Sequence, residues 1–180
     1  MVKTIVIVID MDGTLIDFAQ GCIELALRKM SNPEYYKGLP LTCFCYSQFK
    51  TLKDMGIKLR ILSGVADPVG SPKYITHVDY NSYFARVCEI KTQEIVRLFG
   101  VEHPFESIDF IKQSDSKADF YQRTYGTQAL TESILIDDYH RYCKEWQDLG
   151  GTAYQVGKDI PSLAEALEHI ISWLQKEEEE

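Results

Sequence analysis

A short apolar run near the N-terminus constrains the fold more than any other stretch of the chain. Residues 5–9 are all β-branched and apolar, which is typical of a strand buried on both faces of a parallel sheet. The run ends at Asp10, and a second carboxylate follows at Asp12 before Gly13 lets the chain turn. Asp and Gly are also common turn formers, so this segment alone leaves a simple turn open. Two acids at a central strand end indicate a ligand site, because like charges are costly to bury without a cation.

Strand and helix patterns alternate along the rest of the chain. Apolar runs indicate four further strands, at 58–63, 107–112, 133–138 and 152–156. Helical spacing of apolar residues lies at 17–30, 46–55, 83–99, 114–125, 141–149 and 162–175. The alternation predicts an α/β fold with a doubly wound, parallel, five-stranded Rossmann-like sheet. A length of 180 residues suits a single domain over residues 1–176, followed by an acidic tail at 177–180.

Composition and cysteine usage narrow the functional class. The net charge of −8 argues against an extended nucleic-acid-binding surface, which needs a basic face. No segment has the length of a membrane span or the pattern of a signal peptide, so we expect no membrane association. The five cysteines have neither disulfide nor zinc spacing, which favours reduced thiols and a cytoplasmic protein. They are Cys22, Cys43, Cys45, Cys88 and Cys143.

Three further strand ends carry polar side chains. The second strand ends in Ser63-Gly64, Lys117 lies in the first turn of the helix after the third strand, and the fourth strand ends in Asp137-Asp138. Carboxyl ends of parallel strands share one edge of a sheet, so these groups can meet the two N-terminal aspartates. Alone, the serine and glycine fit a turn, and the lysine fits a surface position. The adjacent aspartates are harder to explain without a cation, because they repel one another.

Together these residues resemble the four motifs of the haloacid dehalogenase-like superfamily of phosphohydrolases. Residues 10–15 resemble the first motif, Leu62-Ser63 the second, Lys117 the third and residues 136–138 the fourth. The first and fourth are specific in combination, whereas the second and third are weak individually. Lys112 is a rival for the lysine of the third motif, and Lys117 is preferred for its position at a helix start.

The resemblance implies a Mg²⁺-dependent phosphomonoester hydrolase. Asp10 would be the nucleophile that forms an aspartyl-phosphate, and Asp12 would be the general acid and base. Mg²⁺ would be held by Asp10, the backbone carbonyl of Asp12, and Asp137. An acid at the position of Asp12 is also what separates the phosphatases of this superfamily from its dehalogenases.

The same resemblance assigns the remaining residues. Ser63, Gly64 and Lys117 would hold the phosphoryl oxygens. Asp138 would orient a metal-bound water or the lysine. The superfamily often covers its site with a cap, and here the only insertion after the first motif is a small lid at about 17–46.

The lid region is rich in aromatic residues. Tyr35, Tyr36, Phe44 and Tyr46 could stack on a nucleobase, or they could pack a helix against the sheet. A partner subunit could complete the lid, and the sequence leaves the oligomeric state open.

The segments 135–139, 144–146 and 150–151 resemble 5′(3′)-nucleotidase-like members. The expected partner is therefore a small phosphorylated metabolite, with a nucleoside monophosphate first. The alternatives are a nearly capless phosphatase acting on a phosphoprotein, another macromolecule or a sugar phosphate, and a catalytically silent binding or regulatory protein.

Overall fold

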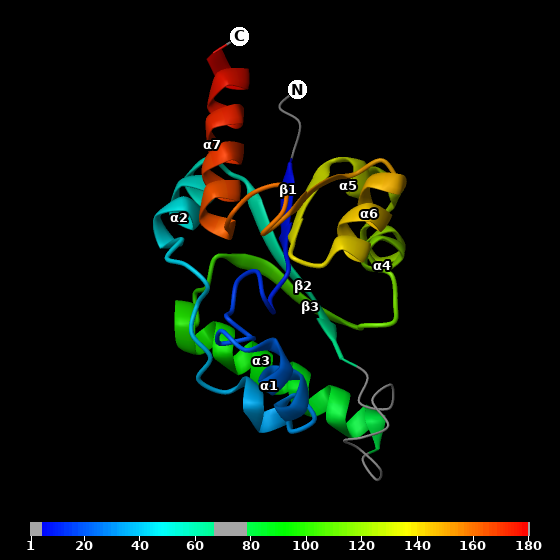
Figure 1. Cartoon of the computed structure of the whole chain (residues 1–180). Coiled ribbons are helices and arrows are strands. Elements are labelled where there is room, and N and C mark those ends of the chain that lie inside the picture. The colour runs from blue at the N-terminus through cyan, green and yellow to red at the C-terminus, as the bar shows by residue number, and fades with distance from the viewer. Residues whose placement is uncertain (1–4, 67–78, 180) are drawn as a thin grey trace.

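The core of the protein is one five-stranded sheet in which every strand is parallel to its neighbours. A computed structural model describes residues 5–66 and 79–179. The strand order is β3-β2-β1-β4-β5 (Figure 1). The strands are β1 (Val6–Ile9), β2 (Lys58–Val65), β3 (Phe105–Lys112), β4 (Ser133–Asp137) and β5 (Thr152–Gln155). Both the parallel sheet and its five strands confirm the prediction.

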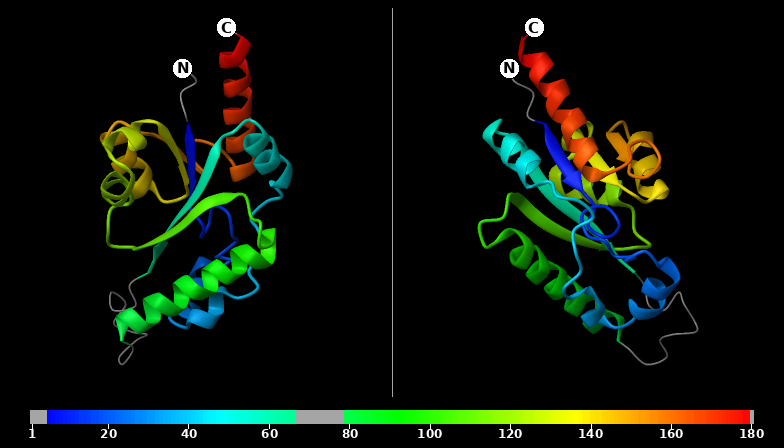
Figure 2. Two further views of the ribbon diagram at one scale, coloured as in Figure 1. Left: turned by 180° about the vertical axis from the view of Figure 1, so that it is seen from behind. Right: turned by 60° about the vertical axis from the view of Figure 1, so that its left-hand side comes forward.

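Helices cover both faces of the sheet, as Figure 2 shows from two sides. One face carries α2 (Tyr46–Asp54), α3 (Tyr80–Phe99) and α7 (Leu163–Glu179), and the other carries α4 (Lys117–Tyr125), α5 (Thr127–Thr131) and α6 (His140–Asp148). Strand β1 serves both layers, because successive side chains of a strand point to opposite faces. Ile7 and Ile9 belong to the core under the first set of helices, and Val6 and Val8 to the core under the second.

The segment after β1 is less helical than its sequence suggests. A helix was expected over 17–30, but α1 spans only Ile23–Lys29 and is followed by the short 3-10 helix η1 (Pro33–Tyr36). Gln20 and Gly21 have φ angles of 45° and 77°, which a right-handed helix cannot include. The side chain of Asp17 accepts a hydrogen bond from the Gln20 amide and closes a turn there instead. Of the residues in α1, only Ala26 is buried.

Other boundaries differ by a few residues. Strand β2 continues to Val65 and β3 begins at Phe105, so both are longer than expected. Helix α7 continues to Glu179, so most of the expected acidic tail is helical, in keeping with the helix propensity of glutamate. Helix α5 was not expected. Most of the predicted loop at 65–74 lies outside the described residues.

Two expectations from composition can be compared with the structure. All five cysteines are free thiols. Within residues 5–66 and 79–179, no helix combines the length and the apolar character that crossing a membrane requires.

Candidate active site

The sheet topology brings the polar strand ends to one edge. Strand β1 lies between β2 and β4, and Ile9 pairs with Ile61 on one side and Ile136 on the other. Asp10 follows this row directly, and its backbone N–H donates to the carbonyl of Ile136 at 2.9 Å. Asp137 ends β4 beside it. The adjacency predicted for the strand ends is therefore present.

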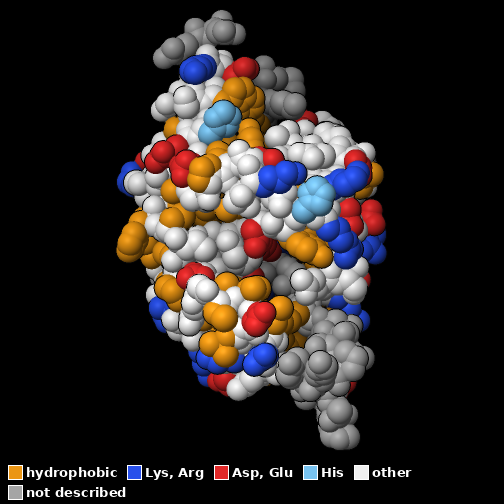
Figure 3. Space-filling view, in the orientation of Figure 1, with side chains coloured by type: hydrophobic (Ala, Val, Ile, Leu, Met, Phe, Trp, Pro, Cys, Tyr) orange, Lys and Arg blue, Asp and Glu red, His pale blue; other side chains and the backbone are white. Residues whose placement is uncertain are grey.

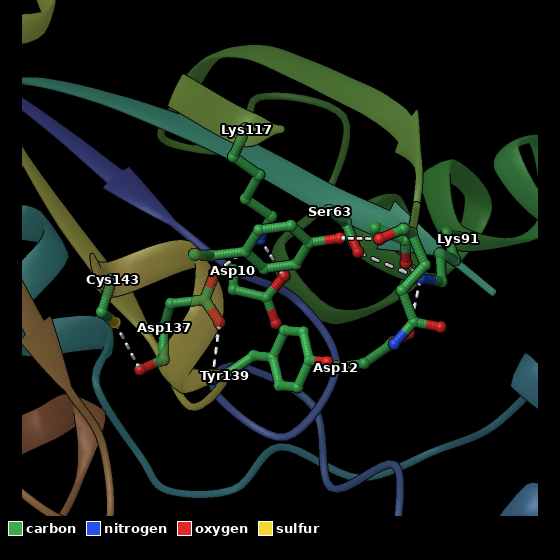
Figure 4. Close-up of polar contacts among 11 residues, drawn as sticks. Asp10, Asp12, Ser63, Lys91, Lys117, Asp137, Tyr139 and Cys143 are labelled. Atoms are coloured by element: carbon green, nitrogen blue, oxygen red, sulfur yellow. Dashed lines mark hydrogen bonds and ion pairs between the residues drawn. The ribbon is translucent and has the colours of Figure 1, made fainter. Parts of the chain in front are cut away.

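Lys117 binds the two buried aspartates. Its Nζ donates to Asp10 Oδ1 at 2.5 Å and to Asp137 Oδ2 at 2.7 Å (Figure 4). The hydroxyl of Ser116 accepts from the Asp119 amide and caps α4, which fixes Lys117 in the first turn. Burial alone would lower the pKa of Lys117, but the two carboxylates outweigh burial and raise it. The rival Lys112 is exposed, with its Nζ over the ring of Tyr80, so the geometry favours Lys117.

Three carboxylates form the one acidic cluster that the described residues offer to a metal ion. One oxygen from each of Asp10, Asp137 and Asp138 lies within 4.8 Å of the others. Burial first, and then the charge of Asp10, raise the pKa values of Asp137 and Asp138, although Lys117 opposes the shift. Three crowded oxygen ligands suit a hard divalent cation such as Mg²⁺. Asp138 thus offers its carboxylate to the cluster directly, in addition to the ligands expected from the sequence.

Gly13 makes room for this cluster. Its φ angle is +83°, and a Cβ atom placed on it would lie 2.2 Å from Asp138 Oδ2. Both the backbone conformation and the close approach therefore require glycine. The turn suggested by the sequence and the acid site are the same structure.

Lys91 binds the second aspartate of the first motif and was not predicted. This residue of α3 is fully buried, and its Nζ donates to Asp12 Oδ2 at 2.6 Å and to Ser63 Oγ at 3.0 Å. A helical signal existed, because Lys91 lies four residues after Val87 and four before Ile95, within the apolar stripe of α3. That stripe lies outside the strand ends from which the site residues were predicted.

Two of the three predicted phosphate-binding residues, Ser63 and Gly64, lie beside this second lysine. Ser63 is fully buried, and the carbonyl of Gly64 accepts from Lys91 at 3.4 Å. A Cβ atom on Gly64 would lie 2.9 Å from the hydroxyl of Tyr142. That hydroxyl donates to the carbonyl of Gln113, the residue after β3, at 2.8 Å, so α6 is held close to the ends of β2 and β3.

A cavity of about 210 Å³ joins these groups to the lid segment. Its polar wall is formed by the four aspartates described above. Its apolar wall is formed by Phe18, Ile23, Leu27, Met30 and Tyr139. Figure 3 shows hydrophobic side chains gathered over α1 on this face of the molecule. Two exposed apolar residues of α1, Ile23 and Leu27, therefore border the site, whereas the exposed Leu25 does not line the cavity.

The sequence left two roles open for the aromatic residues of the lid, which were stacking on a nucleobase and packing a helix against the sheet. Tyr36 is buried against Phe18 and also lines the cavity. Tyr35 packs on the same pair and donates to the carbonyl of Phe18. Tyr46 packs on Phe99, as expected of a packing residue. Phe44 is 87% exposed and does not line the cavity.

A larger cavity of about 920 Å³ lies at the opposite end of the sheet, where residues of β4, β5 and α7 line it. Its acidic and histidine lining residues are Glu132, His169 and Glu177, and no lysine lines it. The three aspartates that the two buried lysines bind line the smaller cavity, so the candidate active site lies there.

Comparisons with known proteins support the fold. No protein-family model matches the sequence, and no curated protein matches it. Among solved structures, a HAD-superfamily hydrolase from Ehrlichia chaffeensis matches with a TM-score of 0.57 and 14% identity, over 97% of this chain and 99% of that chain. A D,D-heptose 1,7-bisphosphate phosphatase from Burkholderia thailandensis matches with a TM-score of 0.56 and 11% identity, over 94% and 99%.

An L-2-haloacid dehalogenase also matches, with a TM-score of 0.51 and 13% identity, over 96% of this chain and 99% of that chain. One fold thus serves both phosphatases and a dehalogenase, and the reaction has to be argued from the side chains. The chain has the haloacid dehalogenase-like fold.

Proposed function

We propose that the protein is a Mg²⁺-dependent phosphomonoester hydrolase that acts through an aspartyl-phosphate on Asp10. The observation that carries the proposal is the pairing of two aspartates with two different buried lysines at the end of β1. Lys117 takes up Oδ1 of Asp10, which leaves Oδ2 for attack on phosphorus. The attack forms the bond between Asp10 and phosphorus as the ester oxygen leaves.

Asp12 is the proposed general acid and base. Burial raises its pKa despite the opposing charge of Lys91, a direction that favours the protonated form a general acid requires. Asp12 gives that proton to the departing ester oxygen. Its carboxylate then accepts a proton from the water that attacks the phosphorus of the aspartyl-phosphate, which releases phosphate and restores Asp10.

The donor set fits Mg²⁺. Asp10, Asp137 and Asp138 would hold the ion, together with the backbone carbonyl of Asp12 expected from the resemblance. When bound, Mg²⁺ supplies positive charge that neutralises the phosphoryl oxygens. Lys117 and the hydroxyl of Ser63 bind those oxygens from the protein side.

A nucleoside monophosphate is the proposed substrate. Ile23, Leu27 and Tyr139 are 54%, 51% and 45% exposed, and all three line the cavity beside the aspartates. An exposed apolar wall next to a phosphate site suits a leaving group with a flat, weakly polar part, such as a nucleobase. Residues 17–46 would act as the small lid that carries this wall.

A phosphoprotein, sugar phosphate or other macromolecular phosphate is the second candidate. The lid helix α1 has only seven residues, and a lid this small would suit a large substrate. A catalytically silent binding protein is disfavoured, because both aspartates of the first motif and both lysines are in place.

The test is Mg²⁺-dependent release of phosphate from para-nitrophenyl phosphate, followed by a panel of nucleoside monophosphates, sugar phosphates and phosphopeptides. We expect turnover that is abolished in Asp10→Asn. Asp54→Asn is the matched control, because this exposed aspartate forms an ion pair with Lys50 on the surface of α2 and lies outside the candidate site. A wild-type protein that is inert with Mg²⁺ across the panel, or an active Asp10→Asn variant, would overturn the proposal.

A further inference from the structure

The buried face of α3 includes one charged residue, Lys91, at a position surrounded by apolar residues. Val87, Ile90 and Ile95 point from this helix into the core, and Lys91 lies among them with none of its surface exposed. A buried ammonium group is costly unless its hydrogen-bonding capacity is filled. The contacts of Lys91 therefore indicate what the residue is for.

All three N–H donors of Lys91 have acceptors. They are Asp12 Oδ2 at 2.6 Å, Ser63 Oγ at 3.0 Å and the carbonyl of Gly64 at 3.4 Å. The ring of Tyr36 lies 5.0 Å from the ammonium nitrogen and covers it. With its donors engaged by the protein, Lys91 has none left for a phosphoryl group. We therefore look for the role of Lys91 in the protein groups that it contacts.

The first neighbour is Asp12. The lysine holds Oδ2, while Oδ1 is buried and has no hydrogen-bond partner among the described residues. A carboxylate fixed through one oxygen keeps a single orientation, so the other oxygen is presented in a defined direction. That free oxygen is the one suited to exchange a proton with a substrate oxygen.

The second neighbour is Ser63. Its oxygen accepts from Lys91, so its own O–H has to donate elsewhere. Figure 4 shows Lys91 reaching Asp12 and Ser63 from one side, while Lys117 reaches Asp10 from the other. Lys117 thus binds the proposed nucleophile within the acidic cluster, and Lys91 binds the proposed acid and the Ser63 hydroxyl.

We propose that Lys91 is a positioning residue that aims Asp12 Oδ1 at the leaving-group oxygen and turns the Ser63 hydroxyl toward the phosphoryl group. This inference rests on the proposed function, because it takes Asp12 as the general acid. It assigns a role to a residue of α3, outside the strand ends that carry the other groups.

The test is the dependence of kcat/KM on the leaving group in Lys91→Met, which keeps the length and apolar stem of the side chain. Because kcat/KM reports the step up to the aspartyl-phosphate, it isolates the protonation of the leaving group. A misaimed acid matters little for para-nitrophenyl phosphate, whose leaving group departs without a proton. For methyl phosphate, which needs the proton, we expect a loss of roughly 10²–10⁴-fold.

Two comparisons make the result specific. Asp12→Asn should show the same selective loss. In the double variant, the excess loss on methyl phosphate over para-nitrophenyl phosphate should be little greater than in Asp12→Asn alone, because both changes remove the same protonation of the leaving group. Glu94→Gln is the matched control on the same helix face. Glu94 accepts from the backbone of Gly38 in the lid, so its variant should lose no more on methyl phosphate than on para-nitrophenyl phosphate.

Thermal unfolding establishes that each variant is folded, and Lys91→Gln replaces the methionine variant if that protein does not fold. An equal loss for all leaving groups would show a merely structural lysine and overturn the inference, as would no loss at all. Failure of the proposed function would look different, because the wild type itself would then release no phosphate.

Discussion

Replacing Gly13 by alanine separates backbone strain from damage to the acidic cluster. At φ +83° an alanine is strained by about 1–2 kcal/mol. For a chain of this size, that loss lowers the melting temperature by about 2–8 °C. The added Cβ would also lie 2.2 Å from Asp138 Oδ2, so the Asp138 side chain has to move away from Asp10 and Asp137. We expect Mg²⁺ affinity to fall roughly tenfold or more.

Gly56→Ala is the matched control. Gly56 has a φ angle of +77°, close to that of Gly13, but no atom lies within 4 Å of a Cβ placed on it. The control should therefore lose a similar amount of stability and keep its Mg²⁺ affinity. Calorimetric titration with MgCl₂ measures the affinity, and thermal unfolding without metal measures the strain. If both alanine variants bind Mg²⁺ like the wild type, the three aspartates are not the metal site.

Three further outcomes are expected. Lys117→Met leaves Asp10 and Asp137 buried without their cation, so denaturant unfolding should show a loss of about 3–5 kcal/mol, whereas Lys112→Met should behave like the wild type. Burial raises the pKa of Asp137 to about 7, so the folded protein keeps this proton at pH values where the unfolded chain has lost it, and the contribution of Asp137 to metal-free stability should fall as pH rises from about 4 to 7. The difference in unfolding free energy between the wild type and Asp137→Asn measures this contribution, and a contribution that rises over this range would contradict the shift. Ile23→Ser or Leu27→Ser removes roughly 1 kcal/mol of apolar contact with the base. The KM for a nucleoside monophosphate should therefore rise about fivefold, while the KM for methyl phosphate stays unchanged. Equal changes in KM for both substrates would exclude a base-binding wall.

The sequence predicted those parts of the site whose chemistry follows from strand ends. A β-branched run that stops at Asp10, or at Asp137, places an acid at the carboxyl edge of a parallel sheet whatever the helices do. Lys117 was found because a cation in the first turn of a helix needs an anion nearby. These expectations depend on local sequence and on one rule of topology.

The remainder depends on tertiary structure. Lys91 was not predicted, because a lysine in an amphipathic helix is expected to be exposed. Its burial depends on how α3 packs against β2. The prediction of a helix over 17–30 was wrong for its first turns, because Gln20 and Gly21 adopt a left-handed backbone conformation. The turn that Asp17 closes takes their place. The contact between Gly13 and Asp138 joins residues that are distant in sequence, so spacing alone does not reveal it.

The charges of the site explain why two lysines accompany four aspartates. Lys91 lies within hydrogen-bonding distance of Asp12 alone among the four, and Lys117 is shared by Asp10 and Asp137. With every group ionised, two negative charges remain, and they lie where Asp138 joins Asp10 and Asp137. One divalent cation balances that excess, whereas Asp12 already has its counter-ion. The carboxyl group of Asp12 is thereby kept apart from the three carboxylates proposed to hold the metal, although it lies only two residues from the nucleophile, and it stays available for proton transfer.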